Sequence, residues 1–236
     1  MVISIVIPAH NEEGNIRATL NDVIKTVSHP HEVVVVDDHS EDSTARIVRE
    51  FMEKNDFVRL IHNHRPKGFS NALITGLENA SGEVVVPVMA DLCDDLSTIE
   101  AMFNKLQEGY DVVCGSRYMP EGRKIGGPLL QSFFSRFVGL TLHWITGIPT
   151  YDAPNAFKMY RKKLLDSLKI EEAGFAVSMQ ITLKAFFKGC RITEVPTTWK
   201  SRIVGKSGFK NFRQAKDYFY WYFWAIKEYL TSYSTK

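Results

Sequence analysis

Two valine-rich runs, each followed by acidic side chains, constrain the fold of this chain more than any other feature. Val33–Val36 leads into Asp37 and Asp38, and Val84–Val88 leads within three residues to Asp91. A continuous apolar run of this kind is typical of a strand buried on both faces, as in a parallel sheet. Ligands of open α/β sheets bind beyond the carboxyl ends of such strands. We therefore expect these carboxylates to lie at a ligand site, where they can bind a metal ion or hydrogen-bond a nucleotide.

The first half of the chain alternates strand patterns with helix patterns. Strands are predicted at residues 2–7, 32–36, 58–62, 83–89 and 111–115, and helices at 11–27, 43–54, 70–79 and 97–108. Asn11 is a suitable N-cap for the first helix, and Asp42 or Ser43 for the second. Strands joined through single helices predict right-handed crossovers and a mostly parallel sheet flanked by helices, so the fold class is α/β.

The pattern changes after Arg117. A glycine-containing loop precedes an amphipathic helix at 129–145, and shorter elements follow: strands at 156–160 and 191–196, and helices at 162–168 and 177–188. A basic loop at 202–210 leads into a last helix at 212–229, which is aromatic nearly all round. Tyr and Trp favour the membrane–water interface, and basic residues favour anionic headgroups. Helices 129–145 and 212–229 therefore predict peripheral membrane contact, with a membrane-protein partner, core packing or a homodimer contact as alternatives.

Charge and composition limit the classes of function. Of the 236 residues, 44% are hydrophobic, which predicts a chain that folds and buries a real core. Residues 1–118 contain 10 Lys and Arg against 19 Asp and Glu, whereas residues 119–236 contain 19 against 8. An acidic half suits metal and nucleotide recognition, and a basic half suits an anionic substrate or membrane surface. The basic half lacks the motifs of nucleic-acid readers, so we expect no nucleic-acid partner.

Cysteine usage and the N-terminus predict a cytoplasmic location. Cys93, Cys114 and Cys190 are scattered, lack metal-ligand spacing and are expected to be reduced thiols. Met1 leads directly into a strand pattern without a basic leader, so we expect no signal peptide. The sequence has no run of about 18 apolar residues, and a transmembrane helix is not expected. The protein is therefore expected at the cytoplasmic face of a membrane.

Two common nucleotide-binding signatures are missing. Residues 8–13 read Pro-Ala-His-Asn-Glu-Glu, where a dinucleotide-binding fold would carry Gly-x-Gly-x-x-Gly after its first strand. A Gly-Lys-Ser/Thr phosphate loop is absent as well. These absences argue against a nicotinamide or flavin enzyme and against a Walker-type nucleotidase.

Short motifs along nearly the whole chain carry a resemblance to a known family. They are Ile5–Glu12, Val36–Thr44, Arg65–Gly68, Ala90-Asp91, Gly115–Tyr118, Asp152–Arg161, Glu194–Pro196, Arg202 and Gly205–Ser207. Together they resemble family 2 glycosyltransferases of the GT-A type, and among these the dolichol- and polyprenol-phosphate mannose synthases. The resemblance implies a GT-A domain at 1–210, with a nucleotide-sugar half at 1–118 and an acceptor half at 119–210, followed by the aromatic helix and tail at 211–236. It also implies inverting transfer of mannose or glucose from a GDP- or UDP-sugar to polyprenyl or dolichyl phosphate.

The resemblance implies roles for single residues as well. Asp38 is expected on the base or ribose of the nucleotide sugar, and Asp91 at the metal and diphosphate. The implied nucleotide-sugar site consists of Pro8, Ala9, Asn11, Glu12, Asp37, Asp38, Lys67, Gly68, Ala90 and Asp91. The acceptor phosphate is assigned to Arg117, Arg136, Arg202 and Lys206, and the catalytic residues are Asp91, Arg117, Asp152 and Arg202.

Met89 departs from the family pattern, which has Asp-x-Asp where this chain has Met89-Ala90-Asp91. A thioether is a poor ligand for Mg²⁺ or Mn²⁺. Asp91 is therefore the predicted metal ligand, together with diphosphate oxygens and water, because Mg²⁺ needs few protein ligands. Asp94 or Asp95 could contribute, although both are expected to cap the helix that begins near Ser97.

The acceptor class depends on whether the reaction needs a general base. A hydroxyl acceptor needs a carboxylate to remove its proton, whereas a lipid phosphate is already an anion and needs cations to position it. Gln180 stands where related sequences often carry Glu, and an amide cannot act as a base. The leading hypothesis is therefore a lipid-phosphate acceptor. The second is a hydroxyl of a glycan or protein with Asp152 as base, and the third is a non-catalytic nucleotide-sugar-binding module, motivated by Met89.

Overall fold

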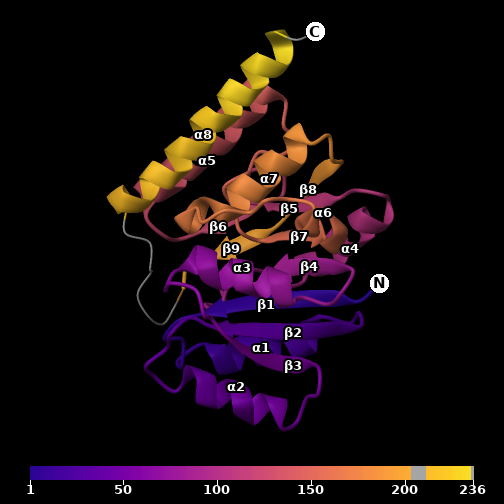
Figure 1. Ribbon diagram of the computed structural model, residues 1–236, viewed down its shortest axis with the longest axis vertical. Helices are drawn as coiled ribbons and strands as arrows, with labels where there is room; N and C mark the ends of the chain where they lie inside the picture. Colours follow the sequence, from indigo (N-terminus) through magenta and orange to yellow (C-terminus); the bar gives the residue numbers. More distant parts are fainter. Residues whose placement is uncertain (203–210, 235–236) are drawn as a thin grey trace.

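The computed structural model describes residues 1–202 and 211–234, in which helices cover both faces of a seven-stranded sheet (Figure 1). The sheet has the order β3-β2-β1-β4-β7-β5-β8. Its strands are β1 (Ile3–Ala9), β2 (His31–Asp37), β3 (Val58–His62), β4 (Val84–Pro87), β5 (Val112–Ser116), β7 (Lys158–Arg161) and β8 (Ile192–Pro196). A separate two-stranded sheet pairs β6 (Arg123–Ile125) with β9 (Thr198–Lys200).

The described helices are distributed along the whole chain. They are α1 (Ile16–Thr26), α2 (Thr44–Met52), α3 (Phe69–Asn79), α4 (Thr98–Gln107), α5 (Leu129–Thr146), α6 (Lys162–Asp166), the 3₁₀ turn η1 (Gly174–Ala176), α7 (Val177–Phe187) and α8 (Asn211–Ser234). Figure 1 shows β1, β2 and β3 with α1 and α2 at one end of the molecule, and α5 with α8 at the other.

Strand β7 runs in the opposite direction to both of its neighbours. It pairs antiparallel with β4 and with β5, whereas the remaining pairs in the seven-stranded sheet are parallel. Because β7 is reversed, its first residue, Lys158, lies at the edge where the parallel strands end. Residues 150–157 therefore meet the carboxyl ends of β4 and β5, and this places a segment from the second half of the chain at the predicted ligand edge.

The valine runs are buried on both sides, as their composition predicts. Ile3, Ile5 and Ile7 of β1 pack in the core with α1, α2 and α4, whereas Val6 packs with α3 and α7 on the other face. In β2, Val33 and Val35 lie on the same face of the sheet as the three isoleucines, and Val34 and Val36 lie on the same face as Val6. Alternate side chains of a strand point to opposite faces, so an unbroken apolar run is needed where helices cover both. The α/β class is therefore confirmed.

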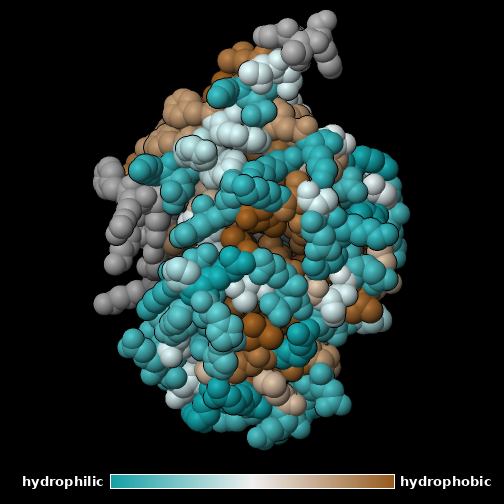
Figure 2. Space-filling model, in the orientation of Figure 1, coloured by the Kyte–Doolittle hydropathy of each residue, from teal (hydrophilic) through white to brown (hydrophobic). Residues whose placement is uncertain are grey.

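Helices α5 and α8 lie side by side across one end of the molecule (Figure 1). Trp221 and Ala225 of α8 are buried against the core, while α5 exposes Leu129, Phe133 and Trp144. Tan and brown apolar residues accordingly follow this end of the surface in Figure 2, above a mainly hydrophilic lower half. Among the residues described, none of the helices combines the length and apolar character needed to cross a membrane.

The structure corrects several local predictions. The first helix begins at Ile16 rather than at residue 11, because Asn11 has a left-handed backbone (φ 51°) and Asn15 occupies the N-cap position. Asn11 therefore does not cap this helix. Asp42, rather than Ser43, contacts the start of α2, since its Oδ1 accepts a hydrogen bond from Thr44 N at 2.9 Å. The three-residue strands β6 and β9 were not predicted, because they are too short to show an alternating pattern.

Candidate active site

The carboxyl edge of the sheet carries a cavity of about 370 Å³. Its charged lining side chains are Asp91, Asp94, Arg117 and Lys124. Its remaining walls come from the loops after β4 and before β7, from β9, and from α3, η1, α5 and α8. The apolar lining residues include Phe69, Met89, Leu130, Phe134, Val138, Phe175, Trp199 and Phe219. The cavity therefore has a charged part joined to an apolar part.

Three motifs that are far apart in the sequence meet at Asp91. Arg202 Nη2 donates to Asp91 Oδ2 at 2.8 Å and to Glu12 Oε1 at 3.3 Å. Cys93 N donates to the other carboxylate oxygen, Asp91 Oδ1, at 3.2 Å. Burial raises the pKa of Glu12, and the nearby Asp91 charge raises it further, although Asn15 and Arg202 oppose both effects. In this arrangement Arg202 is the cation that balances two carboxylates.

Asp94 lies in the cavity wall and does not cap α4. Burial raises the pKa of Asp94 to about 7, and the Asp91 carboxylate adds to this effect. Its Oδ2 accepts a long hydrogen bond of 3.5 Å from Met89 N. Asp95 instead contacts the start of α4, with Oδ1 accepting from Ser97 N at 3.1 Å. The expectation of a cap is therefore wrong for Asp94, and Asp95 contacts the N-cap residue Ser97 without itself occupying that position.

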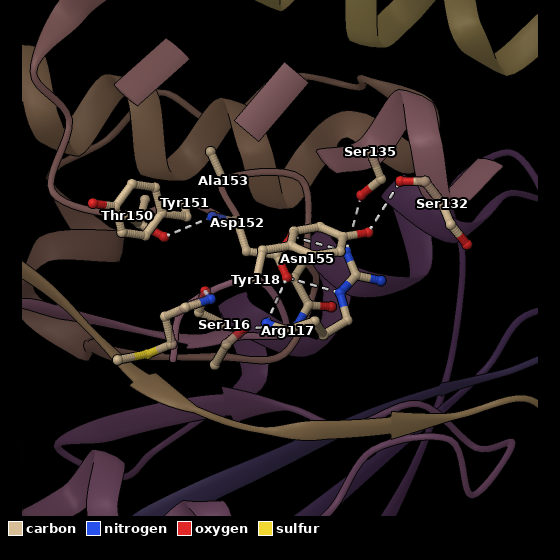
Figure 3. A network of polar contacts seen from close by, with 12 residues as sticks. Ser116, Arg117, Tyr118, Ser132, Ser135, Thr150, Tyr151, Asp152, Ala153 and Asn155 are labelled. Carbon is tan, nitrogen blue, oxygen red and sulfur yellow. Dashed lines mark hydrogen bonds and ion pairs between the residues drawn. The ribbon is translucent and has the colours of Figure 1, made fainter. Parts of the chain in front are cut away.

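Arg117 and Asp152 form a buried ion pair beside the cavity (Figure 3). Arg117 donates to Asp152 three times, from its backbone N at 2.9 Å, from Nε at 2.7 Å and from Nη2 at 2.8 Å. Arg117 Nη2 also donates to Ser135 Oγ on α5, at 3.0 Å. The side chain of Asp152 is fully buried. The pair therefore fixes the guanidinium plane of Arg117 at the cavity and leaves Asp152 engaged on both carboxylate oxygens.

Lys124 is a cavity residue that sequence reasoning missed. It lies on β6, and its ammonium lies 5.0 Å from the centre of the Trp199 ring. Burial lowers the pKa of Lys124 to about 8, and the positive charge of Arg117 contributes to the decrease. Two neighbouring cations thus line one cavity wall, an arrangement that favours an anionic ligand. The only sequence signal was the general excess of basic residues after residue 118.

The predicted nucleotide residues lie at the ends of β1 and β2, where they hold loops together. Asp38 is buried, and its two carboxylate oxygens accept hydrogen bonds from Asn63 Nδ2 at 2.7 Å and from Gly68 N at 2.9 Å. Asp37 contacts the ring of His62 at 3.2 Å and the backbone N of Ser40 at 3.3 Å. The Asp38 contact orders the loop between β3 and α3 against the end of β2.

Five further residues predicted for the nucleotide site lie close to this edge. Pro8 and Ala9 are buried at the end of β1, and Ala90 is buried after β4. Asn11 Oδ1 accepts a hydrogen bond from Glu41 N at 2.8 Å and so joins the loops that follow β1 and β2. Lys67 is exposed in the loop that Asp38 orders. The structure therefore brings the predicted set to one edge of the sheet.

Two of the residues considered for the acceptor site, Arg136 and Gln180, are described by the structure and do not line the cavity. Arg136 is exposed on α5, where its charge acts on the hydroxyl of Tyr118. Gln180 is fully buried in α7, and its Oε1 accepts a hydrogen bond from Glu171 N at 3.0 Å. Lys206 lies outside the described residues. Gln180 is therefore a core residue outside the cavity lining.

Comparison with known proteins gives a consistent set of relatives. Residues 4–169 match the family model described as Glycosyl transferase family 2. A dolichol-phosphate mannosyltransferase of Pyrococcus furiosus is 31% identical over 215 residues, which cover 89% of this chain and 60% of that protein. A polyprenol monophosphomannose synthase of Mycolicibacterium smegmatis is 24% identical over 220 residues, covering 89% of this chain and 83% of that protein. This chain therefore spans less than two thirds of the length of the Pyrococcus relative.

Solved structures of similar fold include glucosyl-3-phosphoglycerate synthase from Mycobacterium tuberculosis in complex with Mn²⁺, UDP and phosphoglyceric acid. That structure superposes with a TM-score of 0.74 at 20% identity, covering 95% of this chain and 78% of its own. Another structure of the same synthase, with Mg²⁺ and UDP, gives a TM-score of 0.67 at 22% identity and covers 87% and 72% of the two chains. Identity at this level establishes the fold alone, and it confirms the predicted arrangement of sheet and helices.

Proposed function

The chain belongs to glycosyl transferase family 2, and from this premise we propose that it transfers mannose or glucose from a GDP- or UDP-sugar to polyprenyl phosphate, with inversion at the anomeric carbon. The proposed acceptor class agrees with the names of two relatives, a dolichol-phosphate mannosyltransferase and a polyprenol monophosphomannose synthase.

One observation carries the proposal: a largely apolar cavity has Arg117 and Lys124 at its charged end, beside Asp91 and Asp94. Arg117 and Lys124 line the same cavity as Leu130, Phe134 and Phe219. A polyprenyl phosphate combines an anionic head with a hydrocarbon chain, and this cavity offers a matching surface to each part. Charge-assisted hydrogen bonds to phosphate are stronger than neutral ones, and a planar guanidinium can form two of them. A sugar hydroxyl acceptor would gain little from walls of this kind.

The bonding of Asp152 also favours an acceptor that needs no base. A general base must have a free oxygen within hydrogen-bond reach of the proton it removes. Asp152 instead accepts three hydrogen bonds from Arg117 and is fully buried. In the proposed reaction an oxygen of the lipid phosphate attacks the anomeric carbon, the bond from that carbon to the nucleoside diphosphate breaks, and no proton has to be removed. Asp152 then positions Arg117 instead of accepting a proton.

A divalent cation, Mg²⁺ or Mn²⁺, fits the oxygen donors at Asp91, although no group of three or more potential metal-ligating side chains occurs among the described residues. Asp91 would hold the cation together with diphosphate oxygens and water, as suits an ion that keeps several waters. The cation supplies charge neutralisation for the leaving diphosphate. Arg202 already pairs with Asp91, so we expect this guanidinium to share the carboxylate with the cation or to move onto the diphosphate.

The nucleoside end of the donor is proposed to lie at the loops after β1 and β2. Asp38 orders the loop that contains Lys67 through its hydrogen bond with Gly68 N. We assign the wall of the nucleoside site to these loops, with Pro8, Ala9 and Asn11 on the β1 side. Because Asp38 is engaged by Asn63 and Gly68, we expect its main effect on donor affinity to come from ordering this loop.

The exposed apolar face of α5 is proposed to contact the membrane that contains the lipid acceptor. Leu129 is 88% exposed, Phe133 65% and Trp144 71%. Phe134 on the same helix lines the cavity, so a lipid phosphate could pass from the membrane to the active site along α5. This would place the protein peripherally at the cytoplasmic membrane face.

The double variant Phe133→Ser/Phe137→Ser should lose co-sedimentation with anionic vesicles, while the control Ile24→Ser/Met52→Ser on α1 and α2 should keep it. If the α5 variant instead loses a concentration-dependent dimer and binds vesicles normally, this face is a homodimer contact.

The proposed reaction is tested by offering GDP-mannose, GDP-glucose and UDP-glucose with Mn²⁺ or Mg²⁺ and a detergent-solubilised polyprenyl phosphate. We expect one donor to yield a glycosylated lipid phosphate of the corresponding mass. Phe134→Ala should raise the KM for the lipid, whereas Phe133→Ala, one residue away and outside the cavity lining, should not. Absence of lipid product with all three donors would reject this acceptor, and donor binding without any transfer would point to a nucleotide-sugar-binding module.

A further inference from the structure

Lys158, the first residue of β7, is a buried cation that the proposed reaction does not yet use. Its side chain is fully buried, and it forms no ion pair with any carboxylate in the described part of the chain. Its ammonium donates to Ala153 O at 2.7 Å and to Ser178 O at 3.3 Å. Burial lowers the pKa of Lys158 to about 8, so most molecules still carry the charge at neutral pH. A buried lysine that is held only by carbonyl oxygens is costly, and this cost calls for a functional reason.

The carbonyl that Lys158 holds belongs to the segment that presents Asp152 to Arg117. Glu194 Oε2 anchors the start of this segment, accepting from Thr150 Oγ1 at 2.9 Å and from Tyr151 N at 2.8 Å. Lys158 anchors its end at Ala153, the residue directly after Asp152. Figure 3 shows Thr150, Asp152 and Ala153 in the stretch that faces Arg117. The position of Asp152, and through it the orientation of Arg117, therefore depends on anchors at both ends.

The charge of Lys158 also adds to the field at this end of the cavity. Arg117 and Asp152 neutralise one another as a pair, and Lys158 supplies a second positive charge at one end of the segment that the Glu194 carboxylate anchors at the other. The Lys158 charge interacts favourably with the Cys114 thiol, when ionised, and with Asp152, and unfavourably with Arg117. Inside a protein such a charge is poorly screened and acts over several ångströms. An anion beside Arg117 would offset it.

We propose that Lys158 is a positioning residue of the acceptor end, which holds the Asp152 segment through Ala153 O and strengthens the binding of a phosphate anion at Arg117. This inference rests on the proposed lipid-phosphate acceptor. It also explains why the chain keeps a charged side chain in its core: burial of the Lys158 ammonium lowers stability, whereas binding of the phosphate requires its charge.

The test compares Lys158→Met with a matched control, Thr182→Val. The methionine variant removes the charge and both hydrogen bonds of Lys158. The valine variant removes a hydroxyl that donates to Ser178 O, one of the same two carbonyls, and leaves every charge in place. Calorimetry would measure the Kd for inorganic phosphate, and steady-state kinetics the KM values for donor and lipid phosphate. Urea unfolding would report the stability of each variant.

We expect Lys158→Met to weaken the binding of inorganic phosphate and to raise the acceptor KM about ten-fold, with the donor KM nearly unchanged. Thr182→Val should lose stability but keep the phosphate Kd and both KM values. Lys158 is only a structural core residue if Lys158→Met binds phosphate as the unmodified protein does. The same conclusion holds if its donor and acceptor KM values change equally, in step with its loss of stability. Arg117→Gln separates this failure from failure of the proposed function: if it too binds phosphate normally, the Arg117 end is not an anion site, and the proposed acceptor site itself fails.

Discussion

The substitution Asp152→Asn distinguishes a carboxylate that positions Arg117 from one that removes a proton. Asp152 is fully buried, the Arg117 side chain is only 9% exposed, and they share three hydrogen bonds of 2.7 to 2.9 Å. Removing one member of a buried ion pair leaves the other charge uncompensated and typically costs about 3 to 5 kcal/mol. In a domain of this size each kcal/mol lowers Tm by about 2 to 4 °C. The variant should therefore melt roughly 6 to 20 °C lower.

The assay measures urea unfolding and lipid-phosphate transfer on the same preparation, at a temperature where circular dichroism shows that the variant is folded. We expect a raised KM for the acceptor, because Arg117 loses its fixed orientation, and a kcat that falls less than about ten-fold. Loss of a general base would instead lower kcat by about 10²- to 10⁴-fold. An unchanged Tm combined with abolished turnover would refute the positioning role and revive the hydroxyl acceptor.

A double substitution gives the control for this experiment. Arg117→Met/Asp152→Leu replaces the ion pair with apolar side chains, an exchange that is often neutral or stabilising in a protein core. We expect its Tm to lie well above that of Asp152→Asn, while its acceptor KM stays high because the guanidinium is missing. Recovery of normal acceptor affinity in the double variant would show that Arg117 does not bind the phosphate.

Three further predictions concern the other charged residues of the cavity. Asp91→Ala should abolish both the response to Mn²⁺ and sugar transfer, as measured by lipid product with and without EDTA; transfer that persists would place the cation elsewhere. For Lys124, whose pKa is lowered to about 8, affinity for the acceptor should fall as pH rises through about 8. Lys124→Met should bind the acceptor about ten-fold more weakly below that pH and remove this decline, as KM measured from pH 6 to 9 would show. The pKa of Asp94 is raised to about 7, so its folded form retains a proton that the unfolded chain releases, and stability is lost as pH rises from about 4 to 7. Asp94→Asn in the metal-free protein should therefore gain roughly 1 to 2 kcal/mol at pH 8 and nothing near pH 3, by urea unfolding; an equal gain at both pH values would contradict the shift.

Much of the fold could be predicted because the strands of this protein are locally encoded. The runs at β2 and β4 are buried on both faces, so packing on each side requires apolar residues at consecutive positions. The direction of β7 could not be predicted, because no local pattern distinguishes an antiparallel central strand from a parallel one. Three-residue strands such as β6 and β9 depend on pairing between distant segments, which leaves no periodicity in either.

The candidate site was predictable to the extent that short motifs carry it. Asp91, Arg117 and Arg202 are brought to one edge of the sheet, as their motifs implied. The role of Asp152 could not be seen, because its ion pair with Arg117 spans 35 positions and depends on the reversed strand. Lys124 was missed for a similar reason: its place in the cavity comes from pairing with Trp199 on β9.

The reversed strand β7 also determines how the chain can be divided and how it can fold. Strand β5 belongs to the first half of the sequence, yet its described sheet neighbours, β7 and β8, both come from the second half. A fragment ending near residue 118 would hold a four-stranded sheet and leave β5 without its partners. During synthesis the central part of the sheet cannot close until residue 161 is available, and β5 gains its second neighbour only with β8. The two halves of the chain therefore form one cooperative unit, and exchanging halves between related chains at residue 118 would disrupt the sheet at its centre.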